Sequence, residues 1–243
     1  MSEFHSANKS ECRKREKVAA RADADSPFFP SSGNGNFLTQ TLEKWEMSPV
    51  GLFLREFINH PREIGAIVPS SRQLARQMAS FVPVRQKGVV VDLGAGTGVV
   101  TSALLDQGVD ARRVVAVERS PRLAGYFRGR FPHVKMIQGD AQLLDQLLED
   151  QFGADYGGVD FIISSLPLRS LPRSVVKSVE QKVHQVLKKN GRFIQFTYDL
   201  RPASLWTFDR LTHCDSHMVW RNLPPARVDV FRSKQGGRLK VEG

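Results

Sequence analysis

The sequence predicts a doubly wound α/β domain, in which a mostly parallel sheet carries helices on both faces and is preceded by N-terminal helices. Two observations support this fold class. From residue 88 onward, short apolar segments alternate with segments whose apolar residues recur at helical spacing. The first apolar segment also runs directly into a glycine-rich turn. Repeated strand-then-helix units imply parallel strands joined by right-handed crossovers. Ligands of such sheets bind beyond the carboxyl ends of the strands.

Strands and helices alternate along this region. Strands are expected at residues 89–92, 114–118, 135–138, 159–164 and 192–197. Helices are expected between them at residues 98–106, 120–131, 141–149 and 175–187. Asn190 and Gly191 supply a stop for the last helix, because helices commonly end at a glycine or an asparagine in the left-handed conformation.

The N-terminal part has a different composition. Residues 1–36 are rich in Ser, Asn, Lys and Arg and hold few apolar residues, which predicts a disordered tail. Residues 37–84 carry apolar side chains at spacings of three and four, including Trp45, Phe53 and Phe57, which predicts amphipathic helices. We therefore expect a tail, a helical cap and an α/β domain over residues 85–243.

The net charge of +10 is unevenly distributed, with about −1 over residues 88–150, +3 over 42–87 and +7 over 151–243. This excess predicts an anionic partner, either nucleic acid or a lipid surface. No apolar run reaches the roughly 20 residues that span a bilayer. The N-terminus lacks an apolar signal core, so a cytoplasmic location is expected. Cys12 and Cys214 make no metal-binding spacing, and no metal is expected.

Glycines and acids mark a ligand site at the ends of the first three strands. The first strand leads into Asp92-Leu93-Gly94-Ala95-Gly96-Thr97-Gly98, where glycines allow a sharp turn and a close approach to a ligand. The G-x-G-x-G spacing differs from the G-x-G-x-x-G of nicotinamide-binding turns. Glu118 ends the second strand, where an acid can bind both hydroxyls of a ribose. Asp140 and Ala141 follow the third strand.

This series resembles the class I S-adenosylmethionine-dependent methyltransferases, over about residues 85–200. The resemblance implies that S-adenosyl-L-methionine is the cofactor and S-adenosyl-L-homocysteine the product. It implies that Glu118 binds the ribose, Asp140 receives the adenine amino group, and Asp92 holds the glycine loop and the amino-acid end of the cofactor. The full set of implied cofactor-binding residues is Asp92, Gly94, Ala95, Gly96, Gly98, Glu118, Asp140, Ala141 and Ser164.

The fourth strand ends in Ser164-Ser165-Leu166-Pro167-Leu168, where amino-methyltransferases of this class hold the acceptor nitrogen. Adenine-methylating relatives have Asn in place of Ser165 and an aromatic residue, which stacks on the base, in place of Leu168. This departure argues against DNA or RNA as the substrate. We expect the Ser165 hydroxyl and the carbonyls of Ser164 and Leu166 to accept hydrogen bonds from a flexible alkylamine instead.

Further segments resemble the bacterial phospholipid N-methyltransferases, which methylate phosphatidylethanolamine stepwise. The matching segments are residues 53–57, 65–71, 165–168, 195–198 and 219–226, and the likeness covers about residues 45–232. It implies a phospholipid substrate, phosphatidylethanolamine or a related aminolipid, and peripheral association with an anionic membrane surface. The helices of residues 38–59 are then expected in the headgroup region, with Arg55 and Arg62 on anionic lipid.

Methylation of an amine requires that donor and acceptor are positioned and that the amine loses its extra proton. Methyl transfer is an in-line displacement at a sulfonium, so positioning supplies most of the rate. A primary alkylamine has a pKa of about 10, as lysine does, and only its neutral form attacks. The site must therefore take up a proton and disfavour the ammonium. Ser165 and Tyr198 are the candidate catalytic residues, and Asp199, His60 and Glu56 are further candidate bases or orienting groups.

Two other functions stay open. One is a ribosomal RNA adenine N6-methyltransferase-like enzyme, which the basic charge favours and Ser165 and Leu168 oppose. The other is a catalytically silent cofactor-binding module that serves as a membrane or partner adaptor, which the intact acids Asp92, Glu118 and Asp140 oppose. The sequence does not decide which aminolipid is used, how many methyl groups are added, or the oligomeric state.

Overall fold

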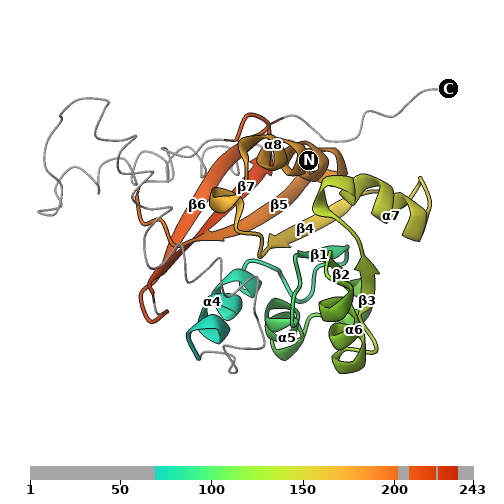
Figure 1. Cartoon of the computed structure of the whole chain (residues 1–243), viewed down its shortest axis with the longest axis horizontal. Coiled ribbons are helices and arrows are strands. Elements are labelled where there is room, and N and C mark those ends of the chain that lie inside the picture. Colours follow the sequence, from blue (N-terminus) through green and yellow to red (C-terminus); the bar gives the residue numbers. More distant parts are fainter. Residues whose placement is uncertain (1–68, 202–207, 223, 235–243) are drawn as a thin grey trace, which may run out of the picture. The chain divides into compact units, whose positions relative to one another are not determined.

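The structure is a computed structural model, and it describes residues 69–201, 208–222 and 224–234 of the chain (Figure 1). All of these residues belong to the second of two compact units, Ile67–Gly243. The tail predicted over residues 1–36 and the amphipathic segment over residues 37–68 lie outside the described residues. The three-segment division of the chain therefore stays a prediction.

The described residues form a mixed sheet of seven strands. Its strands are β1 (Val90–Leu93), β2 (Val114–Glu118), β3 (Lys135–Gln138), β4 (Val159–Ser164), β5 (Leu187–Thr197), β6 (Leu211–Val219) and β7 (Ala226–Ser233). Their order across the sheet is β3-β2-β1-β4-β5-β7-β6. Neighbours from β3 to β5 are parallel, whereas β7 is antiparallel to both β5 and β6. The order reverses between β1 and β4, so the ligand edge is expected at the carboxyl ends of these two strands.

Helices cover both faces of the sheet, as Figure 1 shows. The α-helices are α4 (Pro69–Ala79), α5 (Val99–Asp106), α6 (Pro121–Arg130), α7 (Leu144–Phe152) and α8 (Arg173–Val186). One core joins α4, α5 and α6 to one face through buried side chains such as Met78, Leu104 and Phe127. A second core joins α7 and α8 to the other face through Leu148 and Val183. The doubly wound, mostly parallel fold predicted from the sequence is confirmed.

The predicted helix of residues 175–187 agrees closely with α8, but Asn190 and Gly191 do not form its stop. Helix α8 ends at Val186, and β5 begins at Leu187, five residues before the predicted strand. Leu187 pairs with Val159 of β4, and the next pair joins Phe161 to Arg192, so β5 carries extra residues between the two pairs. Asn190 and Gly191 lie in this irregularity inside the strand. A side chain on Gly191 would come within 3.0 Å of the Lys188 carbonyl, so the glycine serves the backbone turn there.

The last two strands, β6 and β7, were not predicted from the sequence. Strand β7 is buried along most of its length, because it lies between β5 and β6 with a helical layer on each face. Its residues Val228 and Val230 belong to the core on the α4 side, whereas Phe231 belongs to the core on the α8 side. Strand β6 lies at the sheet edge and is mostly half-buried.

Helix α4 belongs to the predicted N-terminal cap, yet it is part of the main core. Leu74 and Met78 of α4 are buried in the same cluster as side chains of α5. Phe81 follows the helix and meets the ring of His217 edge to face, with centroids 5.1 Å apart. Within the described ranges, no helix is both long enough and apolar enough to cross a bilayer.

Gly98 is required by packing between the glycine loop and α6. It has φ +82°, and a Cβ there would lie 2.3 Å from Cε2 of Phe131 and 3.0 Å from Cε2 of Phe127. Both the left-handed backbone and the aromatic rings therefore exclude a larger residue. Gly125, within α6, has nothing within 4 Å of the same virtual atom.

We predict that Gly98→Ala lowers the free energy of unfolding by about 2–5 kcal/mol, combining left-handed strain with overpacking. The matched variant Gly125→Ala should raise it by about 0.5–1 kcal/mol, because alanine costs less backbone entropy in a helix. Urea denaturation of the two variants measures both effects. An unchanged midpoint for Gly98→Ala would contradict the packing assignment.

Candidate functional site

The carboxylate of Glu118 joins two turns at the ligand edge. Its Oε2 accepts a hydrogen bond from the Gly96 N–H at 2.9 Å, and its Oε1 accepts one from the Ser120 N–H at 2.8 Å. An ionised carboxylate offers about four acceptor positions. Two of them remain for a ligand that carries two hydroxyls, and the half-buried side chain leaves room for one to approach.

The glycine loop is held by β2 and leaves open space above one residue. The N–H groups of Gly94 and Ala95 both donate to the Val117 carbonyl, at 2.8 and 3.1 Å. Gly94 is packed beneath Leu166, whose Cδ2 lies 2.8 Å from a virtual Cβ. Above Gly96, at φ +55°, the nearest atom to a virtual Cβ is the Gly94 carbonyl oxygen at 4.0 Å. The three loop glycines thus serve different needs, and Gly96 is the one that borders open space.

Asp92 is fully buried beneath the loop. Its Oδ2 accepts a hydrogen bond from the Thr101 hydroxyl at 2.6 Å, which ties the end of β1 to the first half of α5. Its Oδ1 has no hydrogen-bond partner. Burial raises the pKa of Asp92 from 3.8 to about 6, the Thr101 hydrogen bonds oppose this rise, and the nearby charge of Glu118 adds to it. A cation brought to this edge would favour the ionised form.

Asp140 and Ala141 occupy the turn after β3. Oδ1 of Asp140 accepts a hydrogen bond from the Gln142 N–H at 2.9 Å and so caps the short 3-10 helix Ala141–Leu143. Oδ2 lies 3.6 Å from Nη1 of Arg119, and the carboxylate is 30% exposed. The backbone N–H of Gly139 donates to the Glu118 carbonyl at 3.0 Å, which places the turns after β2 and β3 next to each other.

The loop after β4 crosses the end of β1. The Ser165 N–H donates to the Leu93 carbonyl at 2.9 Å, and the Leu166 N–H donates to Oγ of the buried Ser164 at 3.3 Å. The hydroxyl of Ser165 is half-buried and forms no hydrogen bond with another described residue. Within the described residues, the Ser165 hydroxyl is therefore an unused hydrogen-bond acceptor beside the glycine loop.

Two expectations about this loop need correction. The Leu166 carbonyl already accepts hydrogen bonds from Leu168 N–H and from Nε2 of Gln195, both at 2.9 Å, so it is not available to an amine. Leu168 is 2% exposed and packs in the core on the α8 side. An aromatic residue at position 168 would be buried in this conformation. The case against a nucleobase therefore depends on Ser165 and not on Leu168.

Gln195, which the sequence analysis did not single out, fixes the loop from β5. Its Nε2 donates to the carbonyls of Leu166 and Phe196, at 2.9 and 2.8 Å. Because both partners are acceptors, the amide nitrogen and not the amide oxygen must face them. Its Oε1 is buried without a hydrogen-bond partner. The signal that could have found it is a polar residue within the otherwise apolar run Phe193-Ile194-Gln195-Phe196.

Tyr198 follows β5 at the same edge. Its ring meets that of Phe196 edge to face, with centroids 5.5 Å apart. Burial raises the pKa of the phenol above its usual value, which a hydrogen bond with the Asn222 side chain partly offsets. The phenol is therefore protonated at neutral pH, and it can orient an amine but has no tyrosinate oxygen to act as a base.

Asp199 is the centre of a buried charge cluster. It is 3% exposed and forms ion pairs with Arg169 and with Arg201, the latter at 2.6 Å. Arg227, which pairs across the sheet with Thr197, donates to the Arg201 carbonyl and forms an ion pair with Asp229 at 2.8 Å. Asp199 is thus engaged as a counter-ion, and it is not placed as a free base.

The cluster holds three arginines and two aspartates, so it carries one excess positive charge: Arg169, Arg201, Arg227, Asp199 and Asp229. Burial and repulsion from Arg201 and Arg227 lower the pKa of Arg169 to about 10. The cluster lies at the carboxyl end of β5, next to Tyr198, and can attract an anionic group. His60 and Glu56, the other candidate bases, lie outside the described residues.

Comparisons with known proteins identify the family of the chain. Residues 90–191 match a family model described as a methyltransferase domain. The chain is 36% identical over 180 residues to the ornithine lipid N-methyltransferase of Singulisphaera acidiphila, covering 72% of this chain and 91% of that protein. It is 25% identical over 79 residues to the ribosomal RNA small subunit methyltransferase A of Chlorobium chlorochromatii, covering 32% of this chain and 29% of that protein.

Among solved structures, a Burkholderia thailandensis 1,6-didemethyltoxoflavin-N1-methyltransferase superposes with a TM-score of 0.55 at 17% identity. The superposition covers 84% of this chain and 92% of that chain. At this identity the likeness concerns the fold alone. That structure contains S-adenosylhomocysteine.

The buried carboxyl of Asp92 generates a prediction about pH. Its pKa is about 6 when folded and 3.8 ordinarily, so above pH 6 the folded state holds a charge that water would solvate better. Asp92→Asn removes that cost and keeps an acceptor for Thr101. We expect it to raise the free energy of unfolding by about 2–3 kcal/mol above pH 6. The gain should shrink as the pH falls from 6 to 4, where both states of the wild type become protonated.

Chemical denaturation at several pH values, with the exposed Asp150→Asn as control, measures this difference. A gain that does not change with pH would contradict the buried-charge assignment of Asp92.

Proposed function

The chain belongs to the class I S-adenosylmethionine-dependent methyltransferases, in the same family as ornithine lipid N-methyltransferase, and we propose that it methylates the headgroup amine of an aminolipid. The observation that carries this proposal is the match to a relative named for lipid N-methylation. The match covers 91% of that protein and 72% of this chain. Phosphatidylethanolamine, expected from the sequence, and an ornithine-headed lipid are the two acceptors that we propose to test.

We propose that the acids at the ends of β1, β2 and β3 hold S-adenosylmethionine. Glu118 has two unused acceptor positions for the ribose hydroxyls, and the exposed part of Asp140 can accept from the adenine amino group. The open space above Gly96 fits a ligand that lies on the loop, and the unpaired Oδ1 of Asp92 fits a nearby cation. Gly94, Ala95, Gly98, Ala141 and Ser164 shape these turns. When bound, S-adenosylmethionine supplies a methyl group on a positively charged sulfur.

The residues at the ends of β4 and β5 are proposed to hold the amine. The free Ser165 hydroxyl and the protonated Tyr198 phenol can each accept a hydrogen bond from an amine N–H. Neither can take up its proton at neutral pH, because the phenol pKa is raised by burial. We propose that water takes up this proton, and that partial desolvation of the bound amine disfavours the ammonium.

The charge cluster around Asp199 supports a zwitterionic acceptor. In phosphatidylethanolamine the amine is separated by two carbons from a phosphodiester, and in an ornithine headgroup the side-chain amine is followed along the chain by a carboxylate. Three arginines against two aspartates leave an excess positive charge beside Tyr198. An anion a few bonds from the amine would neutralise it, and arginine is well suited to either anion.

We further propose that the enzyme binds anionic membranes peripherally. The sequence predicts that the amphipathic segment of residues 38–59 lies in the headgroup region, and that Arg55 and the nearby Arg62 meet anionic lipid. These residues lie outside the described ranges.

The RNA alternative has one specific observation in its favour. A ribosomal RNA methyltransferase matches about a third of this chain. That match is shorter and weaker than the match to the lipid enzyme, and position 165 offers a hydroxyl where a nucleobase needs an amide. We therefore place RNA second.

We predict that Glu118→Ala weakens S-adenosylmethionine binding by about 1.5–3 kcal/mol, since hydrogen bonds to a charged group are lost. That is roughly a 10- to 150-fold rise in Kd. Calorimetry measures it, with Asp150→Ala, at an exposed position of α7, as the control for loss of one acid. A folded Glu118→Ala protein with wild-type affinity would remove Glu118 from the site.

The acceptor is tested by incubating the wild-type protein with labelled S-adenosylmethionine and either total lipid or total RNA. We expect label in lipid, and activity on purified phosphatidylethanolamine or ornithine lipid. Methylation of RNA, with both aminolipids unlabelled, would overturn the proposal.

A further inference from the structure

We propose that the arginine-lined pocket between α4, α5 and α6 binds the phosphate of an anionic phospholipid in the bilayer. This pocket is separate from the proposed cofactor and amine sites. None of the residues that line it was assigned a role from the sequence.

The two helical layers differ in charge. Helices α4, α5 and α6 together carry five arginines and one acid, a net charge of +4. Helices α7 and α8 carry three basic residues and four acids, a net charge of −1. The basic excess on the first layer can attract an anionic surface, because each Lys or Arg near such a surface contributes attraction.

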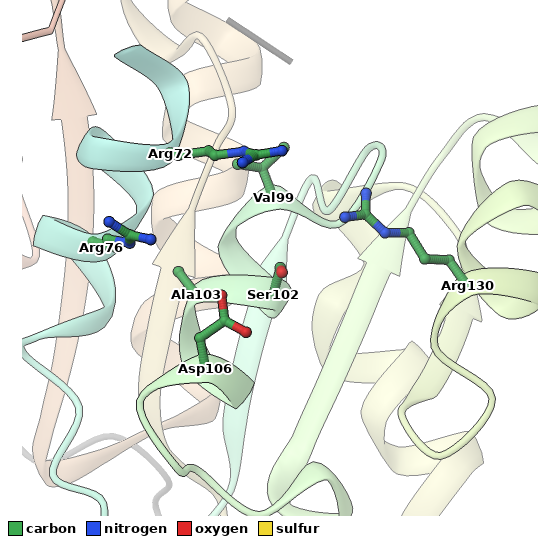
Figure 2. Close-up of a pocket in the computed structure, with 7 residues that line it drawn as sticks. All are labelled: Arg72, Arg76, Val99, Ser102, Ala103, Asp106 and Arg130. Carbon is green, nitrogen blue, oxygen red and sulfur yellow. The ribbon is translucent and has the colours of Figure 1, made fainter. Parts of the chain in front are cut away.

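A pocket of about 200 Å³ lies in the basic layer, and Figure 2 shows its lining. The lining residues are Arg72, Arg76, Val99, Ser102, Ala103, Asp106 and Arg130. Arg72 and Arg76 are one turn apart on α4, and Ser102 and Asp106 are one turn apart on α5. In Figure 2 the guanidinium groups of Arg72 and Arg130 both extend toward Val99, from opposite sides.

The arginines are available to a ligand. Arg130 is held in place, because its Nη1 donates to the Thr97 carbonyl at 3.1 Å and its guanidinium lies 5.0 Å from the centroid of the Phe131 ring. Neither Arg72 nor Arg76 forms an ion pair with another residue of the described ranges. Among the described residues, one acid, Asp106, lines the pocket against three arginines, so these side chains leave an excess of positive charge.

The size and chemistry of the pocket favour a phosphate. Pockets for drug-sized ligands occupy roughly 300–1,000 Å³, so this smaller pocket suits a small anionic group. Arginine binds phosphate oxygens with its planar fork of N–H donors. No aromatic ring of the described part of the chain lines the pocket, so these residues offer no stacking platform of the kind on which single-stranded RNA binding depends.

The position of the pocket points to a membrane as the source of that phosphate. Val99 directly follows the glycine loop and Arg130 contacts the loop at Thr97, so the pocket opens beside the ligand edge. The β6–β7 turn reaches the same edge, because Arg227 pairs with Thr197 at the end of β5. Trp220 in this turn is 68% exposed, and in Figure 1 the turn lies beside α4. An exposed tryptophan in a turn at this edge suits the headgroup region of a bilayer.

The test compares two charge-matched double variants of the full chain. Arg72→Gln with Arg76→Gln removes two pocket arginines, whereas Arg122→Gln with Arg128→Gln removes two exposed arginines of α6 outside the pocket. Flotation with phosphatidylglycerol-containing vesicles, without S-adenosylmethionine, measures the affinity. We expect the pocket pair to lose at least about tenfold more affinity than the control pair, beyond the general attraction between a basic face and an anionic surface. Melting temperatures of both variants should match the wild type.

Equal loss in the two pairs would overturn the proposal, because general electrostatics would then explain the binding. It would also be overturned if the pocket pair lost binding to single-stranded RNA and kept its binding to vesicles. Methylation of an aminolipid by the wild-type protein in neutral detergent micelles tests the proposed function on its own, so its failure is distinguishable from failure of the docking pocket.

Discussion

The carboxylate of Glu118 is the contact on which the ligand edge depends. It receives N–H groups from the loop after β1 and from the turn before α6, so one side chain sets the spacing of two turns. Its charge also contributes to the raised pKa of Asp92 below it. The edge over β1 to β3 therefore gathers negative charge at Asp92, Glu118 and Asp140. This arrangement suits a ligand that carries positive charge, as a sulfonium with an amino-acid ammonium does.

The other half of the same edge has the opposite character. Beyond β5, three arginines surround two buried aspartates. The antiparallel strand β7 supplies Arg227 and Asp229, so the strands added after the parallel sheet build this basic half. A cationic donor on one side and an anionic headgroup on the other would each meet complementary charge. The nitrogen between them would then be placed beside Ser165 and Tyr198, where the loop after β4 crosses the sheet.

The sequence predicted the parallel part of this fold because its strands are bounded by clear turns and β1, β2 and β4 are largely buried. Strands β2, β3 and β4 agree with their predicted bounds, and the glycine loop follows β1 as expected. The C-terminal strands were missed for a physical reason: β6 is half-buried at the edge and alternates weakly. The early start of β5 was missed because Asn190-Gly191 reads as a helix stop, whereas the glycine serves an irregularity in strand pairing.

A site residue could be predicted where its chemical type and its place at a strand end suggest a function. It could not be predicted where tertiary packing determines which way its side chain points. The position of Glu118 at a strand end was predicted, whereas its hydrogen bonds with Gly96 and Ser120 required coordinates. Leu168 was expected near the substrate. Instead it begins the short 3-10 helix Leu168–Ser170 after β4 and packs in the core. Gln195 and the charge cluster depend on contacts between β4, β5 and β7, which no local pattern predicts.

The ligand edge, with acids beyond β1 to β3 and arginines beyond β5, would bring a methyl donor to the nitrogen of an aminolipid. Mass spectrometry of lipid incubated with the wild-type protein and methyl-deuterated S-adenosylmethionine tests it most directly, because headgroup fragments locate the new methyl group. The account predicts deuterated methyl groups on the headgroup nitrogen. Label on an acyl chain or a headgroup oxygen, or label that appears only on RNA, would contradict it.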